Sequence, residues 1–107
     1  MNKLVLNTSS SIFFTKVGLI PPLLKLWTLI TSKEIEKEIK EGEEIGFKDA
    51  RILMQYITDK KITIVDTRGT DSIVKEFTIK KADASVIALA QEKDCFLATE
   101  DRQIERI

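Results

Sequence analysis

Short apolar runs alternate along this chain with stretches in which apolar residues recur at helical spacing. A continuous apolar run of three to five residues is typical of a strand buried on both faces of a sheet. Strands that alternate with helices indicate an α/β fold, a three-layer sandwich with a central, mainly parallel sheet. Right-handed crossovers then place helices on both faces of that sheet. The expected strands are Leu4–Leu6, Trp27–Thr31, Ile62–Val65 and Cys95–Ala98.

The first two helices are predicted from their polar caps and prolines. Ser10 or Ser11 can cap a helix that runs to about Lys16. A second helix is expected to begin near Pro21 or Pro22, because proline fits the first turn of a helix.

The third helix is predicted from a capping-box spacing, since Thr31 stands three residues before Glu34. We expect it to run from about Ser32 to Glu41 and to stop at Gly42. Its buried stripe is expected at Ile35 and Ile39.

Further helices are expected over Phe47–Thr58 and Ala82–Lys93, with a last one starting at Thr99. Residues 72–77 are ambiguous between helix and strand, and a short helix is favoured. The chain shows no internal repeat or linker, and its 107 residues suit one domain over 1–107.

Composition limits the possible chemistry. The 17 Lys and Arg residues balance 17 Asp and Glu, so bulk basicity does not argue for a polyanion partner. The chain has no His, which excludes histidine-based acid–base chemistry and His-ligated zinc. The single cysteine, Cys95, is expected to be a buried free thiol, which fits a cytoplasmic protein. Lys16, Lys25 and the proline pair argue against a membrane span in the apolar segment Ile12–Ile30.

The expected fold selects four polar residues as candidates for a ligand site. Ligand sites in parallel sheets lie beyond the carboxyl ends of the strands. Asn7 directly ends the first strand, and Asp101 follows the last one. Asp83 opens its helix, and Glu38 flanks the buried stripe of the third helix. These residues are far apart in sequence, but a parallel sheet can bring them together at one edge.

Each position also has a purely structural interpretation. Asp83 can serve as a helix cap, and Asp101 can complement a helix dipole. Glu38 lies in a charge-rich run where a solvated helix face is the default. Asn7 can be a strand-ending residue with a local side-chain hydrogen bond. For Asp49, a surface position on its helix is favoured.

Four short motifs occur in a fixed order over almost the whole chain. They are an apolar strand followed by Asn7-Thr8-Ser9, the pair Glu38-Ile39, the helix start Asp83–Ala90, and Thr99-Glu100-Asp101. In this order they resemble the PIN domain, a family of small metal-dependent ribonucleases. The family has Asp where this chain has Asn7.

The resemblance implies an Mg²⁺- or Mn²⁺-dependent endoribonuclease in which Glu38, Asp83 and Asp101 are metal ligands. Asn7 then occupies the fourth catalytic position, where the family has Asp. Divalent metals can activate water and stabilise charge in phosphodiester hydrolysis. Carboxylates without His or Cys favour Mg²⁺ or Mn²⁺ over zinc. The resemblance also implies that a last strand is missing after Asp101, because family members usually continue into one.

Supporting roles are predicted for neighbouring residues. Hydroxyls at Thr8, Ser9 and Thr99 can hold ligands or waters. Cations at Lys33, Lys81 and Arg102 lie close in sequence to the acidic positions and can contact RNA phosphates, with scattered solvated charges as the alternative.

Because Asn7 lacks the negative charge that the family's Asp would place beside a divalent ion, we predict weak or absent metal binding. An engineered Asp-to-Asn change and a naturally degenerate member both stay open. The second would favour a non-catalytic RNA- or protein-binding module on the same scaffold.

The resemblance further implies a homodimer and the toxin half of a toxin–antitoxin pair, inhibited by a small antitoxin protein. Apolar residues of the Ile12–Leu29 segment can belong to the core or to such an interface, among them Phe13, Phe14, Leu23 and Trp27.

Overall fold

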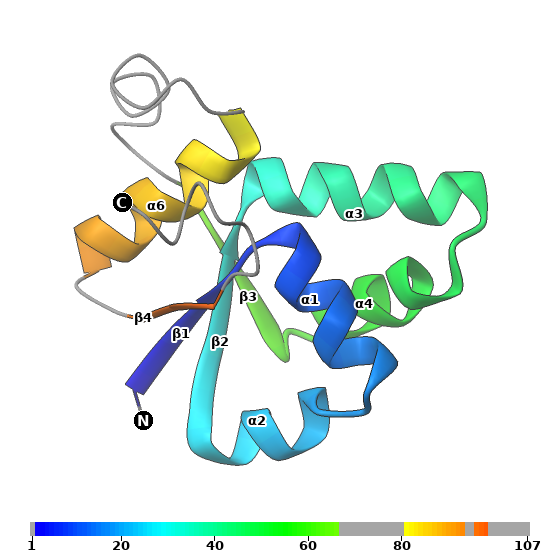
Figure 1. The fold of residues 1–107 in the computed structure, drawn as a ribbon, viewed down its shortest axis with the longest axis horizontal. Helices are drawn as coiled ribbons and strands as arrows, with labels where there is room; N and C mark the ends of the chain where they lie inside the picture. The colour runs from blue at the N-terminus through cyan, green and yellow to red at the C-terminus, as the bar shows by residue number, and fades with distance from the viewer. Residues whose placement is uncertain (1, 67–80, 94–95, 99–107) are drawn as a thin grey trace.

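A computed structural model of the chain describes residues 2–66, 81–93 and 96–98. In this part of the chain, four strands form one parallel sheet in the order β3-β2-β1-β4 (Figure 1). The strands are β1 (Asn2–Leu6), β2 (Trp27–Ser32), β3 (Ile62–Val65) and β4 (Phe96–Ala98). The predicted α/β fold with a central parallel sheet is confirmed.

The chain changes direction across the sheet after β3. From β1 it steps to β2 and then to β3, whereas β4 returns to the opposite side of β1. Leu4 of β1 accordingly pairs with Leu29 of β2 on one side and with Phe96 of β4 on the other. Ligands of open α/β sheets bind beyond the carboxyl ends of the strands at such a reversal, which here lies between β1 and β4. The residue that follows β1 at this point is Asn7.

Helices cover the sheet on both sides. They are α1 (Thr8–Lys16), α2 (Ile20–Leu26), α3 (Lys33–Ile45), α4 (Lys48–Thr58) and α6 (Lys81–Lys93). In Figure 1, α6 lies to the left of the strands, while α1, α3 and α4 lie to their right. Among the described residues, no helix has the length and apolar character needed to cross a bilayer.

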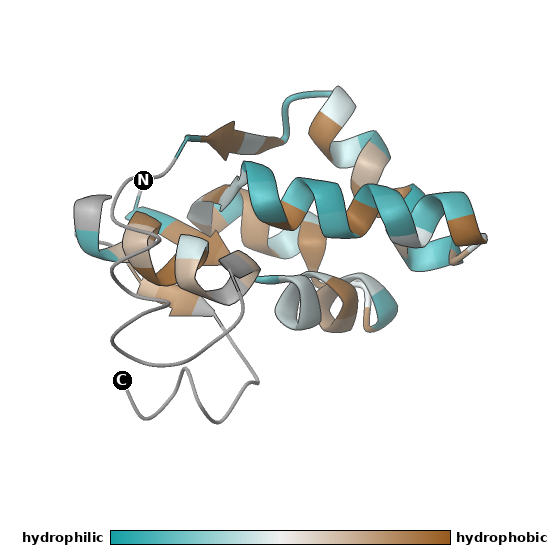
Figure 2. Ribbon diagram, turned by 90° about the horizontal axis from the view of Figure 1, so that it is seen from above, coloured by the Kyte–Doolittle hydropathy of each residue, from teal (hydrophilic) through white to brown (hydrophobic). Residues whose placement is uncertain are grey.

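The core explains the continuous apolar runs of the sequence. Val5 and Leu6 of β1 are fully buried, because helices cover both faces of the central strands. The predicted stripe of α3 is confirmed, since Ile35 and Ile39 are buried, while hydrophilic residues make up most of the rest of the helix (Figure 2). The opposite layer contributes buried Ala84, Val86, Ile87, Ala88 and Leu89 from α6.

The start of α3 differs from the prediction. Ser32 caps the helix, with its Oγ accepting from the Ile35 N–H at 3.2 Å. Thr31 still belongs to β2, and its hydroxyl donates to the Leu6 carbonyl of the neighbouring strand at 2.6 Å. The capping box of Thr31 and Glu34 is therefore wrong, because a contact between strands uses the Thr31 hydroxyl.

The end of α3 also differs. The helix continues through Gly42 to Ile45 and ends at Gly46, whose φ of +107° is a left-handed conformation. A Cβ at Gly42 would lie 3.3 Å from the Cβ of Ala50. Gly42 therefore permits the close approach of α3 and α4, and does not end the helix.

Two other boundaries shift by a few residues. β1 begins at Asn2, before the expected Leu4. Phe47, the expected first residue of α4, is its N-cap, and its side chain is 61% exposed. Cys95, the segment 72–77 and the helix expected from Thr99 lie outside the described residues.

Candidate functional site

Asn7 is the N-cap of α1, where Ser10 or Ser11 was expected. Its Oδ1 accepts from the Ser10 N–H at 2.9 Å and from the Ser9 hydroxyl at 3.2 Å. In return, the Ser10 hydroxyl accepts from the Asn7 N–H at 3.1 Å, which completes a capping box. The side chain is buried, with 1% exposed. The structural interpretation of Asn7, a strand-ending residue with a local hydrogen bond, is confirmed, and an Asp carboxylate can accept the same two bonds.

Glu38 is joined to the start of α1. The Thr8 hydroxyl donates a hydrogen bond to its Oε1 across 30 positions of sequence. Both residues are half-buried. Glu38 therefore does not lie on a purely solvated helix face, because Thr8 holds its carboxylate at the start of α1.

The first turn of α6, which contains Asp83, is fixed to the start of α3 by two buried serines. The Ser85 hydroxyl donates to the Ala82 carbonyl at 2.5 Å. The Ser32 and Ser85 oxygens are 2.6 Å apart, so the Ser32 hydroxyl donates the bond between them. Because Ser32 also caps α3, one chain of hydrogen bonds links the first turns of the two helices.

Several predicted site residues lie outside the described part of the chain. These are Thr99, Asp101 and Arg102, together with the side chains of Asp83 and Lys81. Among the described residues, no three Asp, Glu, Cys or His side chains come close enough to form a metal site. The oxygen ligands that the structure does bring together are the Glu38 carboxylate and the Thr8 hydroxyl, and Asn7 directly precedes Thr8 in the chain. An all-oxygen set of this kind suits Mg²⁺ or Mn²⁺.

Lys33, a predicted RNA contact, is held in an ion pair. Its Nζ lies 2.8 Å from Oδ1 of Asp66, directly beyond the end of β3. The hydrogen bond and the negative charge of Asp66 raise the pKa of Lys33. Both side chains are largely exposed, so the pair links the ends of β2 and β3 at the surface. A role of Lys33 in RNA binding stays a prediction.

Three helices enclose a pocket of about 340 Å³ beside Glu38. Asp49, for which a plain surface position was favoured, is half-buried and lines this pocket. The sequence could not show this, because it depends on how α1 and α3 approach the first turn of α4. The lining consists of Thr8, Ile12, Lys16, Glu38, Ile39, Gly42, Phe47, Asp49 and Ala50.

The parallel sheet with helices on both faces defines a class of small α/β domains. The chain belongs to the PIN domain family, whose model matches residues 3–107. Members of this family are generally nucleases that use divalent metal ions. The resemblance found in the sequence is thereby confirmed.

A solved structure has a similar fold. It is the crystal structure of PAE2754 from Pyrobaculum aerophilum, with a TM-score of 0.68 and 14% sequence identity. The match covers 96% of this chain and 77% of that chain. At this identity the likeness supports the fold alone. The comparison with curated proteins gave no match.

Proposed function

We propose that this chain is a metal-dependent endoribonuclease that hydrolyses phosphodiester bonds in RNA and that Asn7 weakens its activity. The observation that carries the proposal is the contact between Thr8 and Glu38, which holds a carboxylate beside the end of β1. This position lies at the reversal of strand order, where the fold favours a ligand site.

The proposed ligands of Mg²⁺ or Mn²⁺ are Glu38, Asp83 and Asp101, with Asn7 in the fourth position. A bound divalent ion supplies an activated water and neutralises charge on the phosphate. Thr8 orients the Glu38 carboxylate through its hydrogen bond. The Ser32–Ser85 contact keeps the first turn of α6, and with it Asp83, at a fixed place relative to α3.

Asn7 is the reason for the low nuclease activity that we expect of this chain. Its amide oxygen retains acceptor capacity but carries no charge, so one attraction to a divalent cation is missing. The side chain is buried, where charge interactions are poorly screened by water. Because the amide oxygen already caps α1, an Asp at this position would add charge without requiring a different backbone.

The decisive experiment compares cleavage of single-stranded RNA, with Mn²⁺, by this chain and by the Asn7→Asp variant. We expect clear cleavage by the Asp form and little by the parent. Asn2→Asp is the matched control, since it adds the same charge to the same strand at an exposed position. Asn7→Asp combined with Glu38→Gln should be inactive.

Two results would change the conclusion. Equal activity of the parent and the Asn7→Asp form would show that position 7 does not limit catalysis. No cleavage by either folded protein would favour a non-catalytic RNA- or protein-binding module. The toxin role, the antitoxin partner and the homodimer stay predictions that derive from the family resemblance.

A further inference from the structure

The pocket formed by α1, α3 and α4 extends the site beyond its metal chemistry. Its volume of about 340 Å³ falls within the range of small-molecule sites. Its walls are mostly apolar, with Ile12, Ile39 and Ala50 among them. Glu38, a proposed metal ligand, forms part of the same wall. An occupant of this pocket therefore lies next to the phosphate that the metal site would handle.

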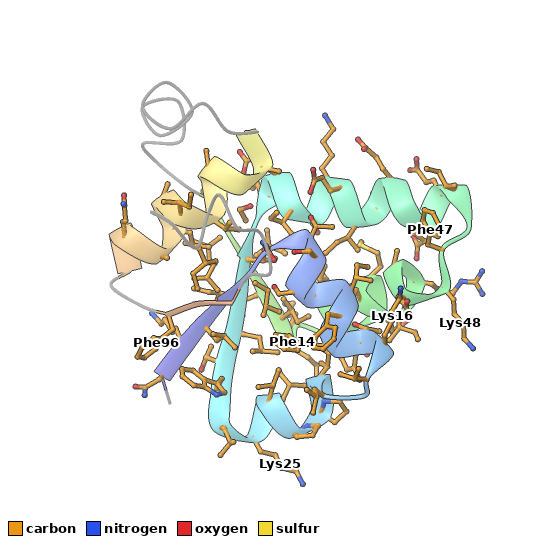
Figure 3. The ribbon with its side chains drawn as sticks, viewed as in Figure 1. Phe14, Lys16, Lys25, Phe47, Lys48 and Phe96 are labelled. Carbon is orange, nitrogen blue, oxygen red and sulfur yellow. The ribbon has the colours of Figure 1, made fainter. Side chains whose placement is uncertain are left out.

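The residues at the edge of the pocket suit a nucleotide. Phe47 lines the pocket while remaining 61% exposed, so its ring is accessible to a stacking partner. Aromatic rings on single-strand-binding proteins stack on nucleobases. Lys16 also lines the pocket and is exposed, which allows its ammonium to contact a phosphate. Figure 3 shows Lys16, Phe47 and Lys48 on the same side of the molecule.

Asp49 indicates which base fits. Its half-buried carboxylate in a mostly apolar pocket favours an occupant that donates hydrogen bonds. A carboxylate offers two acceptor oxygens side by side. The Watson–Crick edge of guanine presents two adjacent N–H donors, on N1 and N2. The same edges of adenine, cytosine and uracil lack such a donor pair.

We propose that this pocket binds one guanine base of the RNA next to the cleaved phosphate. Phe47 stacks on the base, Asp49 accepts from N1–H and N2–H, and Lys16 contacts the phosphate. The inference rests on the proposed function for the identity of the substrate. It makes Asp49 and Phe47 residues that determine specificity.

The test measures nucleotide binding without cleavage. GMP, AMP, CMP and UMP are titrated separately into the ¹⁵N-labelled chain without added metal, and the amide shifts of Ile12, Ile39 and Ala50 are followed. We expect GMP to shift these amides at several-fold lower concentration than the other three nucleotides. Because no cleavage is measured, an inactive Asn7→Asp variant together with GMP binding would contradict the nuclease and leave the base pocket supported.

Variants test the two roles separately. Phe47→Ala should weaken GMP binding at least about fivefold, because each stacked base contributes about 1–3 kcal/mol. Ile45→Ala is the matched control, since Ile45 is 75% exposed and does not line the pocket. Asp49→Asn should remove the preference for GMP over AMP.

Four outcomes would overturn the proposal. The first three are an absence of pocket shifts with every nucleotide, equal binding of all four, and unchanged selectivity in Asp49→Asn. A fourth is a response to arginine amide with none to GMP, which would assign the pocket to a cationic side chain of a protein partner.

Discussion

The hydroxyl of Thr8 ties the start of α1 to the Glu38 carboxylate. Residues that orient metal ligands typically contribute about 10- to 100-fold in metal affinity or activity. We therefore predict that Thr8→Val, made in the Asn7→Asp background, lowers Mn²⁺ affinity at least about tenfold. Isothermal titration calorimetry measures this directly.

The control for Thr8 lies in the same helix. Thr15→Val also removes a hydroxyl, which donates to the Ser11 carbonyl at 2.8 Å and does not contact Glu38. When Thr15→Val is also made in the Asn7→Asp background, its Mn²⁺ affinity should match that of Asn7→Asp alone. Similar losses in the two variants would mean that Thr8 acts through the stability of α1 and not through Glu38.

The ion pair of Lys33 gives a prediction with a defined pH range. Asp66 raises the Lys33 pKa in the folded protein, so the pair stabilises the fold below the unfolded pKa. This contribution disappears as pH rises through the folded pKa. Asp66→Asn should return the Lys33 pKa toward its ordinary range, as measured by NMR of the side chain. Asp59→Asn, which removes a carboxylate bonded to Gln55, should leave that pKa unchanged.

Between elements, the hydrogen bond of Ser32 and Ser85 connects α3 to α6. Ser85→Ala leaves the buried Ser32 hydroxyl and the Ala82 carbonyl without this partner. Unmade bonds of buried polar groups cost about 1–3 kcal/mol. We predict a loss of this size in the free energy of unfolding, measured with urea. A loss below about 0.5 kcal/mol would show that the site relaxes around the missing hydroxyl.

Substitution by alanine should change the stability differently at Gly42, within α3, and at Gly46, its C-terminal cap. At Gly46 the positive φ makes alanine unfavourable by about 1–2 kcal/mol. At Gly42 alanine gains up to about 1 kcal/mol in helix propensity, which offsets the tight contact with Ala50. Urea unfolding should therefore give a larger loss for Gly46→Ala. The reverse order would contradict the assignment of Gly46 as the helix end.

These glycines also show what the sequence could predict at the level of elements. Periodicity located the buried face of α3, because Ile35 and Ile39 lie on one side of the helix through helical spacing alone. It did not identify the helix ends. Gly42 and Gly46 have similar local signals, and only the approach of α4 distinguishes them. For the same reason the Thr31 hydroxyl, which bonds to Leu6 across strands, was assigned to the wrong partner.

For the whole molecule, the apolar runs and the ordered motifs predicted the fold class and the family. The parallel sheet follows from runs that must be buried on both faces. The pocket beside Glu38 could not be predicted from the sequence. It forms between three helices, and local sequence patterns do not determine the distances between them. The side chains of Asp83 and Asp101 lie outside the described residues, so their role as ligands stays a prediction.

Metal binding at the end of β1 should stabilise the whole domain. An ion that binds only the folded state at 100 times its dissociation constant adds about 2.7 kcal/mol to the free energy of unfolding. For a domain of this size each kcal/mol raises the melting temperature by roughly 4 °C or more. We therefore predict that Mn²⁺ raises the melting temperature of Asn7→Asp by several degrees and that of this chain much less.

The control for this prediction removes a carboxylate. In Asn7→Asp with Glu38→Gln, the Mn²⁺-dependent increase should disappear, because the ion loses the negative charge of the Glu38 carboxylate. Differential scanning calorimetry with and without metal measures all three proteins. An equal increase in this chain and in Asn7→Asp would place the ion away from position 7 and separate the metal site from the end of β1.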